Sequence, residues 1–424
     1  MDKLLIMADD FTGALDTGIQ FTKMGIRTKI VTAYDYELSQ LSPQDAILSA
    51  NTDSRPCSAE EAYRRVFTLA SNARKAGFTN VYKKTDSGLR GSIGIELKAA
   101  MEAYGEKVIS FIPAFPKLRR ITRDGIAYID GLPVAESVFG RDPFEPVTVS
   151  DIAEIIHQTA DIQVVKVPKD AYEKVTFDYD RATVLLFDAE TDEDLFAIAR
   201  MLKEKSRTKA MAGCAGFAAA FELMLTFEKG NPHYMQKSDG LLALCGSVNQ
   251  ITVDQVAYAK AHGFSGSSLN NEQKLGMLGD EAEKKAFYDG LYDAFTKTDR
   301  YVLDTLNKAG EESVIDFAAK NGMGLNDIRF KIADSLGWIA REMVERGLNY
   351  TFSMTGGDTL MGFMKSIGVK EIAPICEIGT GAVLSMLGWQ GKNIQVISKS
   401  GGFGEEDIFI RMYDKVMNPS SPEA

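Results

Sequence analysis

Short apolar runs alternate with longer helical patterns along the first half of this 424-residue chain. The apolar runs are LLIMA (4–8), TKIVTA (28–33), DAILSAN (45–51), NVYKKT (80–85), KVISFIPA (107–114), DIQVVKV (161–167) and ATVLLFDA (182–189). Strands separated by helices at this spacing predict a parallel sheet with crossover helices. We therefore expect the first half of the chain to fold as an α/β domain.

A polar stretch, TFEKGNPHYMQKSDG (226–240), contains Gly and Pro and lacks periodicity, as linkers do. The pattern then restarts with LLALCGSVNQIT (241–252), a polar region (264–298), RYVLDTL (300–306), a helix (326–346), NYTFSMTGGDT (349–359) and two closing strands, APICEI and NIQVISKSGGFG. A chain of this length is expected to form more than one core. We predict two α/β domains with mainly parallel sheets, at 1–228 and 239–418, a linker at 229–238 and a disordered tail at 419–424.

The overall charge excludes some partners. The chain has 48 Lys and Arg against 59 Asp and Glu, a net charge of −11, which disfavours binding to nucleic acid. No run of about 18 apolar residues predicts a membrane span. The start, MDKLLIMADD, lacks the long apolar stretch of a signal peptide, so we expect a cytoplasmic protein.

Metal and triad chemistry are also disfavoured. The four cysteines lie far apart without CxxC spacing, and we expect them to be reduced and mostly buried. The three histidines, His157, His233 and His262, lack a neighbouring acid and nucleophile. We assign them no catalytic role.

The first candidate site is ADDFTGALD (8–16), where a predicted strand ends in two acids and a Thr-Gly step opens a helix. Ligands of open α/β sheets bind at the carboxyl ends of strands, so Asp9 and Asp10 are candidate functional residues. The structural alternative is that one acid caps the helix and Gly13 serves packing. The local pattern leaves both interpretations open.

The second candidate site is KKTDSGLRGS (83–92), also at a predicted strand end. A guanidinium and an ammonium together suit a carboxylate ligand, which makes Lys84, Asp86 and Arg90 candidates. The alternative is a solvated turn before a capped helix.

Three small-residue turns in the second half suggest a nucleotide site. TGGDT (355–359) follows an apolar strand and precedes a helix, where glycines let backbone N–H groups approach a phosphate. CGSVNQIT (245–252) and KSGGFG (399–404) are similar turns at strand ends. A Gly-Gly turn that only packs tightly is the alternative, but three such turns in one domain favour convergence on one nucleotide.

Taken together, these motifs resemble the four-carbon acid sugar kinase family. The resemblance covers nearly the whole chain and rests on ADDFTGALDTG, NTDSR (51–55), YKKTDSGLRGSIG, FIPAFP (111–116), DGLPVAESVFGRDPFEPV (130–147), TGGDT and KSGGFG. It implies a sugar-acid-binding N-terminal domain, a nucleotide-binding C-terminal domain and an active site in the cleft between them. ATP would phosphorylate threonate, erythronate or a 3-oxo-tetronate, usually on the terminal 4-hydroxyl.

The resemblance also implies roles for individual residues. The ATP contacts would be Ser247, Gly356, Gly357, Asp358, Thr359 and Gly401. The substrate side would be Asp9, Asp10, Arg55, Lys84, Asp86 and Arg90. This chain departs from the family at Cys245-Gly246-Ser247-Val248-Asn249, where Gly-Ser-Cys-Ser is common, and at KLRRITRDG, where a Gly-Arg pair is more usual. The second departure bears on which acid is accepted.

As a mechanism we hypothesise that Arg90 and Lys84 hold the substrate carboxylate, while Asp9 or Asp10 orients or deprotonates the attacking hydroxyl. Mg²⁺ and the backbone amides of the TGGDT turn would hold the γ-phosphate. Sugar acid and ATP are then the expected partners, and a homo-oligomer is compatible with the sequence.

Other functions remain as alternatives. They are a kinase of another small hydroxy acid, a dinucleotide-dependent oxidoreductase and a non-catalytic sugar-acid sensor. Against the oxidoreductase, the first strand leads into ADDFTGA instead of GxGxxG. Against the sensor, no basic helix-turn-helix is visible.

Overall fold

The structure is a computed structural model that describes residues 1–42, 44–142, 145–230, 234–247, 249–307 and 310–419. The chain divides into two compact units, Met1–Pro232 and His233–Ala424. Part of the predicted linker, residues 231–233, and part of the predicted tail, residues 420–424, lie outside the described residues.

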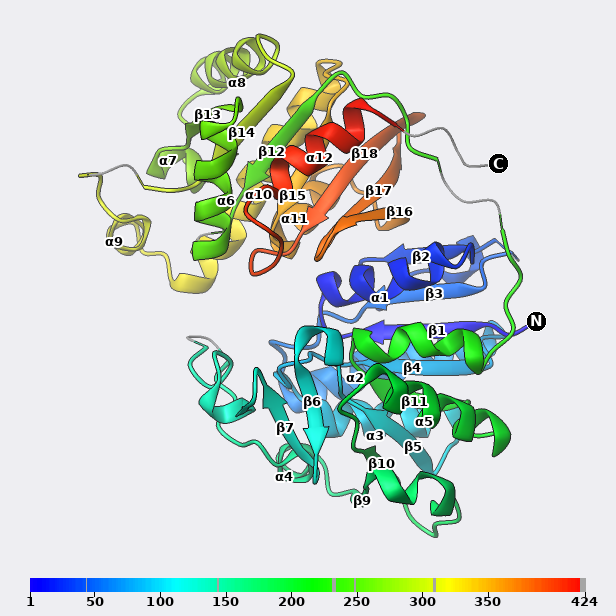
Figure 1. The fold of residues 1–424 in the computed structure, drawn as a ribbon. Helices are drawn as coiled ribbons and strands as arrows, with labels where there is room; N and C mark the ends of the chain where they lie inside the picture. Colours follow the sequence, from blue (N-terminus) through cyan, green and yellow to red (C-terminus); the bar gives the residue numbers. More distant parts are fainter. Residues whose placement is uncertain (43, 143–144, 231–233, 248, 308–309, 420–424) are drawn as a thin grey trace. The chain divides into compact units, whose positions relative to one another are not determined.

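The N-terminal unit is built on a parallel sheet (Figure 1). Its strands, in spatial order, are β2 (Thr28–Val31), β3 (Ile47–Asn51), β1 (Leu4–Ala8), β4 (Asn80–Lys84), β11 (Ala210–Gly213), β5 (Val108–Ile112), β10 (Thr183–Phe187) and β9 (Gln163–Val167). Every residue of β1, β3 and β4 is buried. Burial on both faces explains why β1 reads as a continuous apolar run in the sequence, whereas β4 also buries Lys83 and Lys84.

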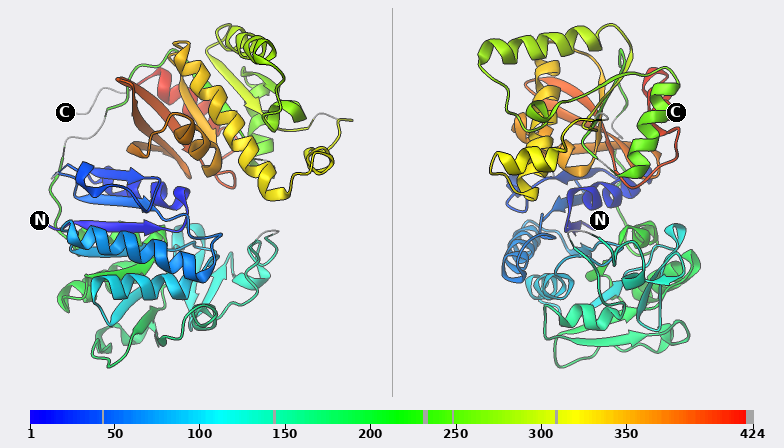
Figure 2. Two further views of the ribbon diagram at one scale, coloured as in Figure 1. Left: turned by 180° about the vertical axis from the view of Figure 1, so that it is seen from behind. Right: turned by 90° about the vertical axis from the view of Figure 1, so that its left-hand side faces the viewer.

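Helices cover both faces of this sheet. One apolar core contains side chains of α1 (Phe11–Lys23), α5 (Asp192–Glu204) and the short helix η5 (Ala215–Leu223). The core on the other face contains side chains of α2 (Ala59–Lys75), α3 (Ile93–Tyr104) and α4 (Ile152–His157). Helices α2 and α3 pack side by side in light blue in the left view of Figure 2. The unit is therefore a three-layer α/β sandwich.

The remaining elements of this unit are short. Strands β6 (Arg120–Arg123), β7 (Ile126–Ile129) and β8 (Leu132–Pro133) form a small antiparallel sheet that the sequence analysis did not predict. Strand β7 is the apolar run IAYI, but it has only four residues and its neighbours are the charged RITR and the dipeptide LP, so the pattern is too short to indicate a sheet. Single 3₁₀ turns occur at η1 (Leu38–Gln40), η2 (Pro116–Leu118), η3 (Val134–Glu136) and η4 (Lys169–Lys174).

The C-terminal unit has a mixed sheet. Its strands, in spatial order, are β13 (Ser265–Ser268), β14 (Arg300–Asp304), β12 (Leu241–Cys245), β15 (Thr351–Thr355), β18 (Lys392–Lys399), β17 (Ala382–Trp389) and β16 (Glu371–Gly379). The strands from β13 to β18 in this order are parallel, whereas β17 pairs antiparallel with both β18 and β16. Both predicted closing strands are present, as β16 and β18, but the prediction missed β17, which lies between them and is reached through turns at Gly381 and Gly391, both with positive φ.

Helices cover this sheet as well. Helices α6 (Gln250–Ala261) and α12 (Ile408–Met417) contribute to the core on one face, in green and red in Figure 1. Helices α10 (Leu325–Glu345) and α11 (Gly357–Ser366) pack together behind the sheet in the same view. The sequence analysis described the region 264–298 only as polar. In the structure this region contains β13, α7 (Asn271–Lys274) and α8 (Glu281–Phe295). Helix α9 (Val314–Lys320) follows β14.

The predicted fold class, two α/β domains with mainly parallel sheets, is confirmed. Within the part of the chain that the structure describes, no helix has the length and apolar character needed to cross a membrane.

Candidate functional site

The predicted residues of the N-terminal unit converge because of the strand register. Ala8, the last residue of β1, lies beside Asn51 of β3 on one side and Lys84 of β4 on the other. The segments that follow these three parallel strands therefore leave the sheet at the same edge. Asp9 and Asp10 follow β1, NTDSR overlaps the end of β3, and Asp86 and Arg90 follow β4. All six predicted substrate residues belong to this edge.

Arg55 links the acids of the site. Its Nε lies 2.7 Å from Asp9 Oδ2, its Nη1 2.9 Å from Asp10 Oδ2 and its Nη2 3.9 Å from Asp86 Oδ1. Burial alone would lower the pKa of Arg55, but Asp10, Asp9 and Asp86 raise it well above its ordinary value. Burial alone would likewise raise the pKa of Asp9, but Arg55 with Lys83 and Lys84 holds it below its ordinary value. Asp9 is thus held ionised by nearby cations.

Asp9 and Asp10 differ in accessibility. The Asp10 side chain is 33% exposed and that of Asp9 is 2% exposed. Asp10 is the N-cap of α1, because its Oδ1 accepts a 2.7 Å hydrogen bond from the N–H of Gly13. Asp9 Oδ1 is buried and has no hydrogen-bond partner among the described residues. The capping alternative considered for this motif therefore holds for Asp10, and its second oxygen is still exposed beside Arg55.

Gly13 allows the lysine of the second motif to approach α1. A Cβ atom at this position would lie 2.6 Å from Asp10 Oδ1 and 2.9 Å from Lys84 Nζ. Lys84 is 6% exposed, and its Nζ donates a 2.8 Å hydrogen bond to the carbonyl of Thr85. The ammonium group, the Asp10 carboxylate and the first turn of α1 are consequently neighbours.

Arg90 is already engaged by two carboxylates. Its Nε and Nη2 lie 2.7 and 3.3 Å from the two oxygens of Asp86, and its Nη1 lies 2.9 Å from Asp142 Oδ2. Although burial favours a raised pKa at Asp86, Arg55 and Arg90 hold that pKa well below its ordinary range. Within the described part of the chain, Lys84 has no such direct carboxylate contact, so it has more capacity for an additional anion.

A second buried ion pair, between β4 and α3, lies next to this edge of the sheet. Lys83 and Glu96 are fully buried, with 3.0 Å between Lys83 Nζ and Glu96 Oε2, and Ser54 Oγ donates to Glu96 Oε1. Burial raises the pKa of Glu96, and Lys83 opposes that shift. The sequence analysis missed this pair because Glu96 lies on α3, and only the fold brings the helix to β4.

Two arginines sandwich an aromatic ring beside the site. The guanidinium carbons of Arg90 and Arg120 lie 5.2 and 5.1 Å from the ring centroid of Phe139. A Cβ atom at Gly88 would lie 2.3 Å from that ring, so only glycine fits there. The family motifs contain Gly88 and Phe139, but no local pattern assigns them this packing.

A cavity of about 120 Å³ borders Arg90 within the same unit. Its lining includes Glu145, whose pKa is raised by burial against the opposing effect of Arg55 and Arg90. The space is equivalent to a few water molecules, which is suitable for a small ligand group.

The predicted nucleotide residues of the C-terminal unit converge for the same topological reason. Cys245 of β12 lies beside Thr355 of β15, and Thr355 lies beside Lys399 of β18. Ser247, the run Gly356 to Thr359, and Gly401 follow directly after these neighbouring strand ends.

The TGGDT turn forms the N-terminus of α11. Gly356 has φ +97° and donates its N–H to the carbonyl of Lys399 at 2.8 Å, and the helix begins at Gly357. Asp358 pairs with Arg329, with 3.0 Å between Asp358 Oδ1 and Arg329 Nη2. The Thr359 hydroxyl donates to the carbonyl of Thr355 at 3.0 Å, so this side chain fixes the turn. The free backbone N–H groups of the first turn suit an anion.

The other two turns are packed against each other. A Cβ atom at Gly401 would lie 2.4 Å from Ser247 Oγ, and Thr252 Oγ1 donates to the carbonyl of Gly401 at 2.8 Å. Asn249 caps α6 directly after Ser247. The two helix N-termini and the glycine turns give the chemistry that a nucleotide phosphate chain requires. Lys399, 2% exposed at the end of β18, also belongs to this edge, although the sequence analysis gave it no role.

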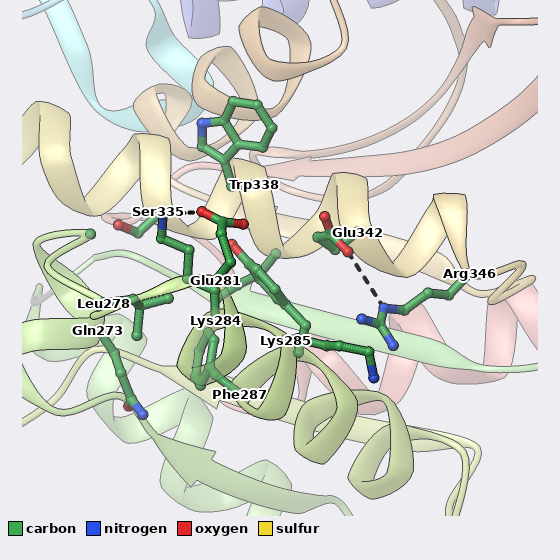
Figure 3. Close-up of a pocket in the computed structure, with 13 residues that line it drawn as sticks. Gln273, Leu278, Glu281, Lys284, Lys285, Phe287, Ser335, Trp338, Glu342 and Arg346 are labelled. Carbon is green, nitrogen blue, oxygen red and sulfur yellow. Dashed lines mark hydrogen bonds and ion pairs between the residues drawn. The ribbon is translucent and has the colours of Figure 1, made fainter.

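A larger cavity of about 620 Å³ lies elsewhere in this unit, between α8 and α10 (Figure 3). It is lined by charged and aromatic side chains that include Glu281, Lys284, Trp338, Glu342 and Arg346. Its charges pair with each other, at 2.8 Å for Lys284 with Glu281 and 3.5 Å for Arg346 with Glu342. None of the predicted nucleotide residues lines it.

Few side chains in the described ranges suit metal binding or thiol chemistry. Across the described ranges, no group of three or more His, Cys, Asp or Glu side chains could hold a metal ion. The four cysteines are free; Cys214 and Cys245 are buried, whereas Cys57 and Cys376 are half-buried. His157 and His262 bond to backbone carbonyls, and His233 lies outside the described residues.

The two α/β units, one with a charged strand-end site and one with glycine turns at helix N-termini, have the features expected of a small-molecule kinase. Comparison with protein families agrees: residues 4–221 match the sugar-binding N-terminal domain and residues 242–409 match the nucleotide-binding C-terminal domain. The chain belongs to the four-carbon acid sugar kinase family, as its motifs predicted. It is a phosphotransferase with an alcohol group as acceptor.

Relatives with named activities match over almost their full length. A D-threonate kinase of Salmonella typhimurium is 27% identical, covering 95% of this chain and 96% of that protein. A D-erythronate kinase of Heliobacterium modesticaldum is 25% identical, covering 100% and 99%. A 3-oxo-tetronate kinase of Brucella melitensis is 24% identical, covering 96% and 94%.

Two crystal structures share the fold. One, from Salmonella typhimurium LT2, has a TM-score of 0.79 at 20% identity and covers 97% of this chain and 99% of its own. The other, a Haemophilus influenzae protein of the DUF1537 family, has a TM-score of 0.72 at 20% identity and covers 96% and 98%.

Proposed function

We propose that this protein transfers the γ-phosphate of ATP to the terminal 4-hydroxyl of a four-carbon sugar acid, which is threonate, erythronate or a 3-oxo-tetronate. The observation that carries the proposal is the cluster of Asp9, Asp10, Arg55, Lys84 and Asp86 at the edge of the sugar-binding unit. Opposite charges at hydrogen-bonding distance suit a small ligand that has both hydroxyls and a carboxylate. The named relatives act on such acids.

Asp10 is our candidate for the group that contacts the attacking hydroxyl. It is 33% exposed, whereas Asp9 is 2% exposed and has its Oδ2 on Arg55. Asp9 would then position Arg55, and Arg55 would orient Asp10. Phosphoryl transfer passes through a loose transition state, so a carboxylate that orients the hydroxyl is sufficient, and a strong base is not required.

Lys84 is our candidate for the substrate carboxylate. Its ammonium lies beside the first turn of α1, where helix N–H groups also favour an anion. Arg90 would shape the site through Asp86 and Asp142, since its guanidinium is occupied by both. The cavity beside Arg90 and Glu145 offers space for the rest of a small acid.

The nucleotide is proposed to bind at the glycine turns of the other unit. Gly356, Gly357 and the amide of Asp358 would face the phosphates from the start of α11, with Ser247 and Gly401 adjacent. Mg²⁺, which supplies charge neutralisation when bound, would be held mainly by the phosphates and water. In-line transfer needs the reacting atoms about 3–3.5 Å apart, so the proposal requires the two ligands to meet during turnover.

Coupled ADP release is the test. Purified protein with Mg-ATP would be assayed against the D and L forms of threonate and erythronate, glycerate, and 3-oxo-tetronates generated in situ by a dehydrogenase. Turnover with a four-carbon acid is the expected result, and mass spectrometry of the product would identify the phosphorylated hydroxyl. ATP binding with no turnover across the panel would refute the four-carbon acid assignment, and no ATP binding would refute the kinase site itself.

Two alternatives follow from the same site. Turnover with glycerate alone would indicate a kinase of another small hydroxy acid. Acid-induced thermal stabilisation without ATP consumption would indicate a sugar-acid sensor.

A further inference from the structure

Lys399 occupies a buried position at the nucleotide edge of the C-terminal unit. It is the last residue of β18 and is 2% exposed. Its neighbour in the sheet is Thr355, and its carbonyl accepts the N–H of Gly356 at 2.8 Å. Its backbone therefore touches the start of α11, and its ammonium lies at the turn after β18, where it contacts the carbonyl of Ser400.

The hydrogen bonds of this ammonium are incomplete. Lys399 Nζ donates to the carbonyl of Ser400 at 2.9 Å, although an ammonium group has three donors. Two other buried lysines have more partners. Lys83 pairs with Glu96 and also donates to the carbonyl of Lys84. Lys274 donates to the side-chain oxygens of two asparagines.

The surrounding charges do not neutralise Lys399. In the ranges that the structure describes, no carboxylate forms an ion pair with it. Two acids at strand ends of this unit have other partners: Asp304, the last residue of β14, pairs with Lys260 at 2.7 Å, and Asp358, after β15, pairs with Arg329. Cys245 on β12 remains a neutral thiol, because burial raises its pKa to about 12.

The helix beside Lys399 adds to this imbalance. The N-terminus of α11 carries a partial positive charge, and its first N–H groups lack intrahelical partners. A buried cation next to a helix N-terminus is unfavourable unless an anion binds both. The same edge contains Ser247 and Gly401, which face each other at close range.

We propose that the ammonium group of Lys399 binds the phosphate chain of the nucleotide. The inference rests on the nucleotide site proposed above and adds to it a charged residue that the glycine turns lack. A charge-assisted N–H···O bond to a phosphate oxygen would satisfy a free donor of Lys399, while the backbone N–H groups of α11 would bind the same phosphate chain.

Nucleotide binding should then depend on the protonation of Lys399. Burial lowers its pKa to about 8 in the free protein, so the group is mostly charged near pH 7 and mostly neutral well above pH 8. A phosphate binds the charged form and raises that pKa. Affinity for nucleotide should therefore fall as the pH rises through 8, by at most about tenfold per pH unit.

Calorimetric titration with Mg-ADP at about pH 7 and about pH 9.5 tests this inference. For Lys399→Met we expect Kd at pH 7 to rise about ten- to a hundredfold, as for a lost charged hydrogen bond, and the alkaline loss of affinity to disappear. For Lys399→Arg we expect most of the affinity to remain at both pH values, because a guanidinium stays charged.

Lys392→Met is the matched control. Lys392 lies at the opposite end of β18, is exposed, and donates to the carbonyl of Val344. It should keep wild-type affinity and the wild-type pH profile. Tryptophan fluorescence confirms that each variant is folded in the C-terminal unit, since Trp338 and Trp389 both belong to it.

A folded Lys399→Met protein with wild-type affinity, or with the wild-type alkaline loss, would overturn the inference. These outcomes leave the kinase assignment intact if wild-type protein binds nucleotide. The absence of nucleotide binding in the wild type would instead overturn the nucleotide site together with this inference.

Discussion

The two strand-end sites use the same topology with opposite chemistry. In the N-terminal unit, carboxylates and cations saturate one another around Arg55 and Arg90. In the C-terminal unit, the corresponding edge consists of glycine turns, hydroxyls and one buried lysine without a carboxylate partner among the described residues. Each unit has a lysine as the last residue of a parallel strand, Lys84 in the N-terminal unit and Lys399 in the C-terminal unit. The ammonium group of each lysine donates a hydrogen bond to the carbonyl of the next residue.

This difference indicates what each site requires of its ligand. In the first site Lys84 alone lacks a carboxylate partner among the described residues, so beyond this one contact the site selects its ligand by geometry and hydrogen bonding. A site with uncompensated positive charge gains most from an anion. We therefore expect substitutions in the first site to act on stability and turnover, and substitutions in the second to act on nucleotide affinity.

The largest expected effect is on turnover in the N-terminal site. Asp10→Asn should lower kcat by about 10²–10⁴, the range for loss of a positioned carboxylate that orients the attacking hydroxyl and receives its proton. Asparagine is as good an N-cap as aspartate, so helix α1 should remain intact and thermal unfolding should change little. Steady-state kinetics and a thermal melt of the same preparation check this. Wild-type kcat in Asp10→Asn would exclude the carboxylate from the reaction.

The next effect is on the stability of the N-terminal unit. Arg55→Met leaves Asp9 and Asp86 buried without their shared cation, and we expect a loss of about 3–5 kcal/mol in the free energy of unfolding. Circular dichroism follows both units during urea denaturation, whereas tryptophan fluorescence follows the C-terminal unit alone. Only the first signal should shift.

Arg64→Met is the control for this change. Arg64 belongs to the same unit but is 54% exposed and pairs with Glu61 on the surface of α2. Its loss should cost less than about 1 kcal/mol. Equal effects of the two substitutions would contradict the view that Arg55 neutralises buried acids.

A smaller effect concerns how stability depends on pH. Stability should rise with pH, whereas nucleotide affinity should fall. Lys399 has a pKa of about 8 in the folded protein and about 10.4 when unfolded, so the unfolded state binds more protons between these values. Without nucleotide, the C-terminal unit should therefore gain up to about 3 kcal/mol between pH 8 and pH 10.4 relative to Lys399→Met. Urea denaturation followed by tryptophan fluorescence measures this difference; a constant difference over that range would contradict the lowered pKa.

The packing of the two glycine turns predicts a selective effect on the nucleotide. Gly401→Ala places a methyl group where Ser247 Oγ lies 2.4 Å away, so the turns must separate. We expect the KM for ATP to rise about ten- to a hundredfold, that is about 1.4–2.7 kcal/mol, while the KM for the acid stays unchanged. Gly290→Ala, in helix α8 with open space around its Cβ position, should leave both KM values unchanged.

The smallest effect is expected for an exposed pair at the edge of the nucleotide site. Arg329 is 57% exposed and Asp358 is 39% exposed. Arg329→Ala should change stability by less than about 1 kcal/mol, because exposed ion pairs contribute little. If the KM for ATP rose more than about tenfold, Arg329 itself would have to be assigned to the nucleotide site.

The sequence predicts most of the fold because the parallel strands are buried on both faces. LLIMA and LLALC are continuous apolar runs at strand length, and each ends at a predicted site; NVYKKT also ends at one, although it contains two lysines. The antiparallel strands were harder to predict: β17 follows β16 through a short turn without a helix between them, and β6 to β8 are too short to show periodicity.

For the sites, the sequence places residues at strand ends but does not give their contacts. Arg55 follows β3, and its bonds to Asp9 and Asp10 depend on β3 pairing with β1. The Lys83–Glu96 pair depends on α3 packing over β4. Lys399 stands in a glycine-rich motif, but the absence of a carboxylate partner among the described residues becomes visible only in the folded unit.

The capping bond from Gly13 to Asp10 has a consequence for protein engineering. One carboxylate both starts helix α1 and, in our proposal, receives the acceptor hydroxyl, so acceptor specificity cannot be redesigned at this position independently of folding. Library diversity there is restricted to residues that can cap, chiefly Asn, Ser and Thr. Useful variation for new acceptors should instead be sought at Glu145 and its neighbours around the small cavity, where side chains can change without disturbing the start of a helix.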